Sequence, residues 1–188
     1  MEHKKRKQIR LKGYDYSQNG LYFVTVCTKN HSQILWKPQI DVGATLGRPL
    51  SEYRMSNGYK NIKSILTDYG IIIDNEINNI SKCYNYGVNV DEYVIMPNHI
   101  HLIIKINKIV FDINGRPQVV PTNNVPTVSR IMQQFKGAVT KQIGISIWQK
   151  SFYDHIIRNK KEYKIIVKYI QENPMKWEED CLYTLNKE

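Results

Sequence analysis

The sequence has no run of apolar residues approaching the roughly 18 needed to cross a bilayer, so we expect no membrane-spanning helix. Its three cysteines, Cys27, Cys83 and Cys181, are odd in number, scattered and without a CxxC pair, and they indicate neither a disulfide framework nor a zinc knuckle. No apolar segment follows the charged first residues, which therefore do not predict a secretory signal. Together these absences favour a protein of the reducing cytoplasm.

Acidic residues are too few to balance the basic ones. Lysine and arginine number 27 against 17 aspartates and glutamates, which gives a formal net charge of +10 and a pI near 9.4. With 188 residues, 41% apolar and 23% charged, the composition is typical of one globular domain over residues 1–188. The positive surplus favours a polyanionic partner, nucleic acid ahead of an anionic membrane, although a merely basic protein would have the same charge.

Much of the positive charge is concentrated near the N-terminus. Residues 3–12 contain six cations and no acid. We interpret residues 1–19 as a basic DNA-binding arm, but a solvated tail would have the same composition. The cations are Lys4, Lys5, Arg6, Lys7, Arg10 and Lys12.

The spacing of apolar residues predicts alternating strands and helices. The predicted strands are residues 20–30, 88–96, 99–107 and 145–159, and the predicted helices are residues 57–81, 128–143 and 160–174. The first helix is expected to break near Gly70, the last is stopped by Pro174, and residues 38–54 and 112–127 are predicted loops. The order predicts an α+β protein: a ferredoxin-like βαββαβ antiparallel sheet with one helix added at the C-terminus.

Two histidines share one face of the strand at residues 99–107. Side chains at positions i and i+2 of a strand point the same way, so His99 and His101 lie together while Ile100 turns into the core. Two imidazoles a few ångströms apart suit one divalent metal ion. A histidine pair is also common for structural reasons, so a metal site needs a third ligand.

The last helix offers that ligand beside its apolar stripe. Tyr169 and Asn173 are four residues apart and therefore lie one turn apart on the same side. In this helix alone, the better explanation is structural: Tyr169 as a half-buried aromatic and Asn173 as a C-terminal cap before proline.

Taken together, these four residues predict cleavage of DNA through a covalent tyrosine intermediate. A hard divalent ion, Mg²⁺ or Mn²⁺, held by His99, His101 and Asn173 would stabilise the charge that develops on the scissile phosphate. The Tyr169 phenol would attack phosphorus in line and form a phosphotyrosine ester.

Three segments carry a family resemblance: "MPNHIHLII", "WQKSFYDHIIRN" and "YIQENPMKWEED". In this order they resemble the REP-associated tyrosine transposases, a group of single-tyrosine HUH (His-hydrophobe-His) nucleases. His99 and His101 match the HUH signature, and "YIQEN" matches the family's tyrosine helix, with Tyr169 as nucleophile and Asn173 as amide metal ligand. The resemblance spans most of residues 6–180 and is weakest in the two predicted loops.

The resemblance implies a ferredoxin-like core whose histidine face is covered by the tyrosine helix. It also implies metal-dependent cleavage of single-stranded hairpin DNA, which leaves a 5′ phosphotyrosine and a free 3′ hydroxyl. The family further suggests that the basic arm helps to recognise a guide sequence beside the hairpin. A monomer acting in cis is the state that the resemblance favours, with a homodimer as the alternative.

Several residues keep alternative interpretations. Tyr163 and Tyr153 are rival nucleophiles, but Tyr163 lies in the apolar stripe and neither has a helical amide four residues later. His155 supports either a metal or phosphate contact or, more simply, a packed structural contact. Trp148 and Trp177 are interpreted as packing residues.

Two other functions remain open. A domesticated relative that binds hairpin DNA or RNA without cutting would have the same charge and the same sheet. A hydrolase of small phosphoesters is disfavoured by the basic arm and by the absence of a carboxylate-rich metal cluster.

Overall fold

Four strands form one antiparallel sheet in the order β2-β3-β1-β6. The computed structural model describes residues 13–37, 65–84, 87–107, 109–111, 117–119 and 126–183. The strands of the sheet are β1 (Gly20–Cys27), β2 (Val88–Ile95), β3 (His99–Ile106) and β6 (Tyr153–Ile157). Two short strands, β4 (Ile109–Phe111) and β5 (Pro117–Val119), pair separately.

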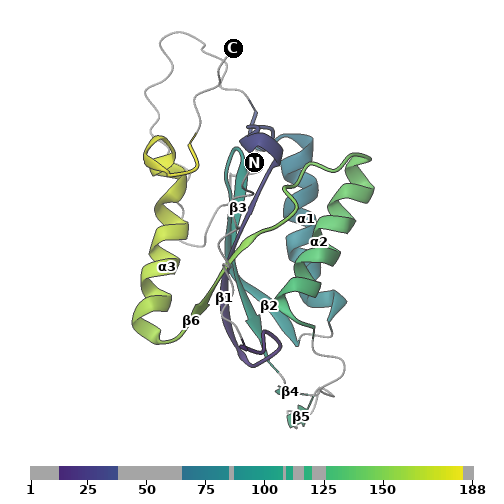
Figure 1. The fold of residues 1–188 in the computed structure, drawn as a ribbon, viewed down its shortest axis with the longest axis vertical. Helices are drawn as coiled ribbons and strands as arrows, with labels where there is room; N and C mark the ends of the chain where they lie inside the picture. The colour runs from purple at the N-terminus through teal and green to yellow at the C-terminus, as the bar shows by residue number, and fades with distance from the viewer. Residues whose placement is uncertain are drawn as a thin grey trace, which may run out of the picture.

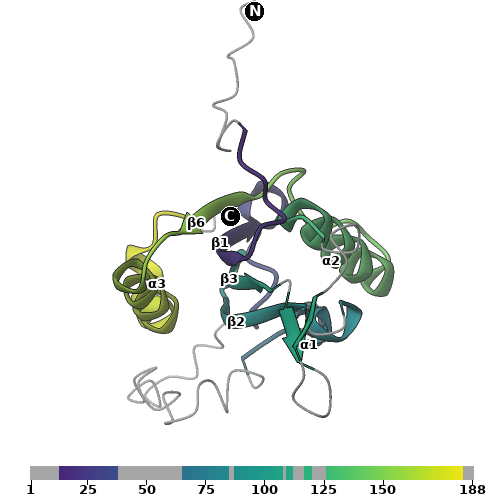
Figure 2. The same cartoon turned by 90° about the horizontal axis from the view of Figure 1, so that it is seen from below.

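The helices lie on opposite faces of the sheet. α1 (Asp68–Cys83) and α2 (Val128–Ile143) cover one face, and α3 (Lys160–Glu172) covers the other (Figures 1 and 2). Two 3₁₀ helices flank these elements: η1 (Lys29–His31) after β1, and η5 (Asn173–Glu179) directly after α3. Within the described ranges, no helix is long and apolar enough to span a membrane.

The alternation of side chains divides each central strand between the two faces. On β1, Tyr22, Val24 and Val26 are fully buried under α1 and α2. The residues between them face α3, and among these Thr25 pairs directly with His101 of β3. The period of two in the sequence therefore separates a purely apolar face from a face that carries polar groups.

A second, smaller apolar cluster fixes α3 on that polar-bearing face. Ile170 is fully buried there against Val94, Met96 and Ile103 of the sheet region. Only residues 158–159 separate the end of β6 from the start of α3, so the helix folds back at once onto its own sheet.

Side chains at the helix start strengthen this attachment. Asn159 caps α3 by accepting a hydrogen bond from the backbone N–H of Glu162, and the Glu162 carboxylate lies 2.6 Å from His155 Nε2 on β6. The Tyr163 hydroxyl donates to Asp91 of β2 at 2.5 Å. The predicted packed role of His155 agrees with its contact to Glu162.

The predicted fold is confirmed: a ferredoxin-like antiparallel sheet with an added C-terminal helix. Several predicted boundaries were wrong. α1 begins at Asp68, where Thr67 caps it, and residues 57–64 lie outside the described part of the chain. Gly70 lies within the first turn of α1 and does not break it. A glycine is required there because the backbone passes close to the Leu35 carbonyl: a Cβ would lie 2.5 Å from that oxygen.

Other predicted boundaries also need correction. The predicted strand over residues 145–159 is paired as a regular strand only from Tyr153 to Ile157, while Trp148 forms an isolated bridge with Thr28. α3 ends at Glu172, and the chain continues into η5, which has Pro174 near its start. β2 ends at Ile95. The predicted loop at 38–54 lies outside the described residues, as does most of the one at 112–127, whose residues 117–119 form β5.

Candidate active site

His99 and His101 lie side by side on β3, under α3 and the turn that follows it. Both are almost completely buried, with 0% and 3% of their surface exposed, and their Nε2 atoms are 3.0 Å apart. The strand geometry expected from the sequence therefore brings the two imidazoles into direct contact.

A chain of hydrogen bonds fixes the tautomer of His99. The Asn98 side-chain N–H₂ donates to the Leu182 carbonyl at 2.8 Å, which leaves the Asn98 carbonyl oxygen facing His99 Nδ1, also at 2.8 Å. Since that oxygen only accepts, His99 Nδ1 must carry the proton and Nε2 must carry the lone pair. A lone pair at Nε2 is what a metal ligand requires.

His101 is held by residues of β1. Its Nδ1 lies 2.8 Å from the Thr25 hydroxyl, which can donate or accept, and its ring stacks on Phe23 with centroids 5.1 Å apart. The hydroxyl can therefore serve both tautomers of His101, including the one that leaves Nε2 unprotonated.

Burial keeps both histidines neutral. It lowers the pKa of His99 to about 3, with nearby His31 as a lesser cause. Burial likewise lowers the pKa of His101 to about 3, and His99 contributes less. Both rings are thus uncharged at neutral pH and free of the protons that would compete with a cation.

Tyr169 brings its phenol to this pair from α3. Its hydroxyl lies 3.2 Å from His101 Nε2 and donates to Asp180 Oδ2 at 3.2 Å, while 41% of the residue remains exposed. Burial of the hydroxyl, and then the negative charge of Asp180, raise the pKa of Tyr169 well above its ordinary value. The phenol is therefore protonated at neutral pH, at a site still accessible from outside.

Asn173 lies one turn later, at the C-cap of α3. It is 3% exposed, its amide N–H₂ donates to Asp180 Oδ2 at 3.0 Å, and its carbonyl oxygen is buried without a hydrogen-bond partner among the described residues. An unsatisfied buried oxygen costs about 1–3 kcal/mol and calls for an explanation.

Asp180, in the turn after η5, was missed in the sequence. Its carboxylate contacts both Tyr169 and Asn173, and one of its oxygens lies within 4.8 Å of ring nitrogens of His99 and His101. The signal was the acidic run at 178–180, five to seven residues after Asn173, but no periodicity identifies which acid turns inward.

These groups fit a hard divalent cation. Two cis ligands about 2.1 Å from an octahedral ion lie about 3.0 Å apart, which is the separation of the two Nε2 atoms. The Asp180 carboxylate and the unsatisfied Asn173 oxygen would provide oxygen ligands, a mixture that suits manganese or magnesium. Asn173 as an amide ligand stays a prediction, and Asp180 is a further candidate ligand.

The other predicted residues lie elsewhere or outside the described chain. Tyr163 hydrogen bonds to Asp91, away from the histidines, and Tyr153 is 46% exposed on β6. Trp148 is buried in the core beneath α2, as predicted, whereas Trp177 packs against His99 with ring centroids 5.9 Å apart. The six cations of the basic arm all lie outside the described residues.

The family model for IS200-like transposases matches residues 53–173, more than half of the chain. An uncharacterized protein of Haemophilus influenzae is 33% identical over 95% of this chain and 93% of its own length. A second protein of that organism, named as a candidate REP-associated tyrosine transposase, is 25% identical over 86% of this chain and 74% of its own.

A solved structure has a similar fold. It is that of a REP-associated tyrosine transposase bound to a REP hairpin, with a TM-score of 0.53 and 22% identity over 89% of this chain and 74% of that one.

Proposed function

This chain belongs to the IS200-like transposase family, and on that premise we propose that it cuts and rejoins single-stranded hairpin DNA through Tyr169. The family resemblance drawn from the sequence is thereby confirmed. One observation carries the proposal: the Tyr169 hydroxyl lies 3.2 Å from His101 Nε2, which lies 3.0 Å from His99 Nε2. A nucleophile next to a buried pair of metal-competent imidazoles is the arrangement that phosphoryl transfer by a tyrosine needs.

The cleavage step follows from the positions of these groups. The Tyr169 oxygen attacks phosphorus in line, a phosphotyrosine ester forms at the 5′ end, and the bond from phosphorus to the 3′ oxygen breaks. The phenolic proton passes to Asp180 Oδ2, which already accepts it in a hydrogen bond. The 3′ oxygen leaves as a hydroxyl after taking up a proton from solvent. In the rejoining step a 3′ hydroxyl attacks the same phosphorus, and Tyr169 regains its proton.

His99, His101, Asn173 and Asp180 are the residues that would hold the divalent ion. When bound, Mg²⁺ or Mn²⁺ supplies positive charge that stabilises the negative charge developing on the scissile phosphate. Asn98 and Thr25 orient the two imidazoles through hydrogen bonds at Nδ1: Asn98 to His99, and Thr25 to His101. Asp180 also holds the Asn173 amide so that its carbonyl oxygen, not its N–H₂, stays free of hydrogen bonds within the described residues.

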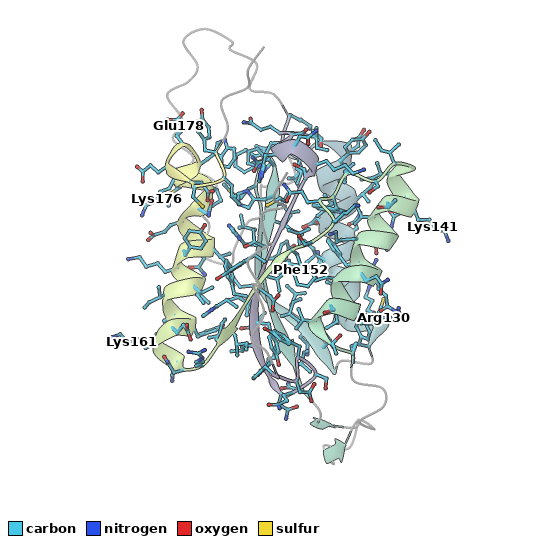
Figure 3. The ribbon with its side chains drawn as sticks, in the orientation of Figure 1. Arg130, Lys141, Phe152, Lys161, Lys176 and Glu178 are labelled. Atoms are coloured by element: carbon cyan, nitrogen blue, oxygen red, sulfur yellow. The ribbon has the colours of Figure 1, made fainter. Side chains whose placement is uncertain are left out.

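Hairpin DNA is the substrate that the charge and the relatives support. The protein has a formal net charge of +10, and a solved relative of similar fold is described as bound to a REP hairpin. Exposed lysines also flank the described structure: in Figure 3 Lys161 of α3 and Lys141 of α2 point away from the sheet on opposite sides. We assign the six cations of residues 4–12 to phosphate contacts, so affinity should fall by about 0.7 log units per log unit of salt for each phosphate neutralised.

We propose that one chain forms one complete site. The two-residue connection at 158–159 and the burial of Ile170 hold α3 against its own sheet, and Tyr169 reaches His101 of the same chain. A monomer acting in cis therefore needs no rearrangement of α3.

An assay of covalent adducts tests the proposal. Wild type, Tyr169→Phe and Tyr163→Phe would be incubated with labelled single-stranded hairpins taken from the repeats around the gene, with manganese or with chelator. A denaturant-resistant protein–DNA band should form in wild type and Tyr163→Phe, only with metal, and be absent in Tyr169→Phe. Binding without any adduct in wild type would favour the alternative, a hairpin-binding protein that does not cut.

A further inference from the structure

A cleft opens beside the candidate nucleophile. It encloses about 450 Å³, and Tyr169, His101 and Thr25 form part of its wall. Pockets that hold small organic ligands have volumes of about 300–1,000 Å³, so a cleft of this size has room for a nucleobase. Any group in the cleft would therefore be next to the reacting phosphate.

The sheet register leads from the histidines directly to an exposed aromatic ring. His101 pairs with Thr25, and Thr25 pairs with Tyr153 of the edge strand β6, so the three side chains form one row on the same face. Neighbouring strands are about 4.8 Å apart, which places Tyr153 about 10 Å from His101 along this row. Tyr153 is 46% exposed and lines the cleft. An exposed ring in this position is suited to stack on a base.

Polar groups also form part of the cleft wall. Gln149 and His31 both line it, and their side chains lie 3.1 Å apart. His31 reaches this position from a backbone with a positive φ of 53°, a conformation uncommon for a residue other than glycine. An amide and an imidazole provide both donors and acceptors for the edge of a base.

Hydrogen bonds from Lys136 hold the segment that bears Gln149 and Tyr153 in place. The Lys136 ammonium on α2 donates to the carbonyl of Gln149 at 2.5 Å and to that of Lys150 at 3.2 Å. In Figure 3, Phe152 of the same segment lies over the sheet between the helices of the two faces, and it also lines the cleft. The aromatic and polar walls are thus held by the fold rather than by a bound ligand.

We propose that this cleft binds the base of one nucleotide beside the scissile phosphate, with Tyr153 stacking on the base and Gln149 contacting its edge. The inference rests on the proposed function, because that function places DNA at Tyr169. The cationic chain and the position of the cleft favour a nucleotide as occupant, and the stacking ring together with the amide supplies what recognition of a base requires. The cleft would make the protein itself contribute to the choice of cleavage position.

The test combines substrate and protein variants of the full chain. Hairpins with randomised single-stranded flanks would first be cleaved and sequenced to find the cut position, and an abasic nucleotide would then be placed at each flanking position. One abasic position should lower kcat/KM about five- to tenfold in wild type, the lower end of what loss of a base–aromatic stack costs. On the intact substrate, Tyr153→Ala should lower kcat/KM by the same factor. With the abasic substrate, the kcat/KM of Tyr153→Ala should fall no further, because the stacking contact is already lost. Tyr153→Phe keeps the ring and should recover most of the activity that Tyr153→Ala loses.

Two controls separate the possible failures. Ile145→Ala removes a side chain that is 58% exposed just before the same segment and does not line the cleft, so it should cleave as wild type. Binding is followed independently with 2-aminopurine at each flanking position in Tyr169→Phe, where its fluorescence should be quenched at one position and restored by Tyr153→Ala. Additive losses, or quenching unaffected by Tyr153→Ala, would overturn the cleft assignment. Wild type that binds but forms no adduct would refute the proposed function alone, since the fluorescence assay needs no cleavage.

Discussion

Acidification should destabilise the metal-free protein through its two buried histidines. In the folded protein, burial holds the pKa of both His99 and His101 at about 3, whereas an unfolded histidine has a pKa of about 6.5. Between these values the unfolded chain binds more protons than the folded one. Stability is therefore fully present above about pH 6.5 and is lost progressively as the pH falls toward 3.

The magnitude follows from the difference in proton binding. At pH 5 the unfolded histidine is about 97% protonated, and its folded counterpart is almost entirely neutral. This difference lowers the free energy of unfolding by about 2 kcal/mol for each ring and about 4 kcal/mol for both. The value depends little on the folded pKa, because pH 5 lies well above it. A loss of this size is a large fraction of the about 5–15 kcal/mol that stabilises a typical domain.

Urea unfolding with chelator at about pH 7.5 and pH 5 would measure this effect in wild type, His99→Gln, His101→Gln and the double variant. Glutamine does not titrate, so each single variant should lose about half of the pH-dependent difference and the double variant nearly all of it. An unchanged difference in the double variant would refute the reasoning, since other groups would then cause the acid sensitivity.

Three further predictions test the site and the fold. Asn173→Ala should weaken manganese binding, measured by calorimetry, by about 10- to 100-fold or more. Losing a residue that only hydrogen bonds to a metal ligand already costs that much, and an unchanged affinity would show that Asn173 is not a ligand. Tyr163→Phe removes the hydrogen bond to Asp91 and should lower the free energy of unfolding in urea by about 1 kcal/mol or less, with adduct formation unchanged; a loss of adduct would revive Tyr163 as nucleophile. Gly70→Ala places a Cβ 2.5 Å from the Leu35 carbonyl and should destabilise the protein by about 1–3 kcal/mol, so an unchanged Tm would contradict this close approach.

The arrangement of elements was predictable because periodicity of apolar residues reports which face of a strand or helix is buried. The alternation in β1 and β3 predicted two strands, and for β3 it predicted one apolar face; these two strands form the centre of the sheet. Element ends depend on local contacts instead. The approach of Gly70 to Leu35 is a tertiary contact, so the glycine suggested a break where the helix continues.

The site was predictable to the extent that its residues share one element. The spacing of His99 and His101 on a strand, and of Tyr169 and Asn173 on a helix, places each pair on one face without knowledge of the fold. Asp180 was missed because it follows the last helix in a segment without periodicity. Thr25 was missed because its contact with His101 depends on strand register, which no local pattern encodes.

Peptide mapping of the covalent adduct tests the central claim most directly. Wild type would be reacted with a hairpin substrate and manganese, digested with nuclease and protease, and analysed by mass spectrometry for the residue that retains a nucleotide. The account predicts a single phosphotyrosine at Tyr169, on a peptide absent from the chelated reaction. A nucleotide on Tyr163 or Tyr153, or on no tyrosine of a reaction that has cleaved its DNA, would contradict it.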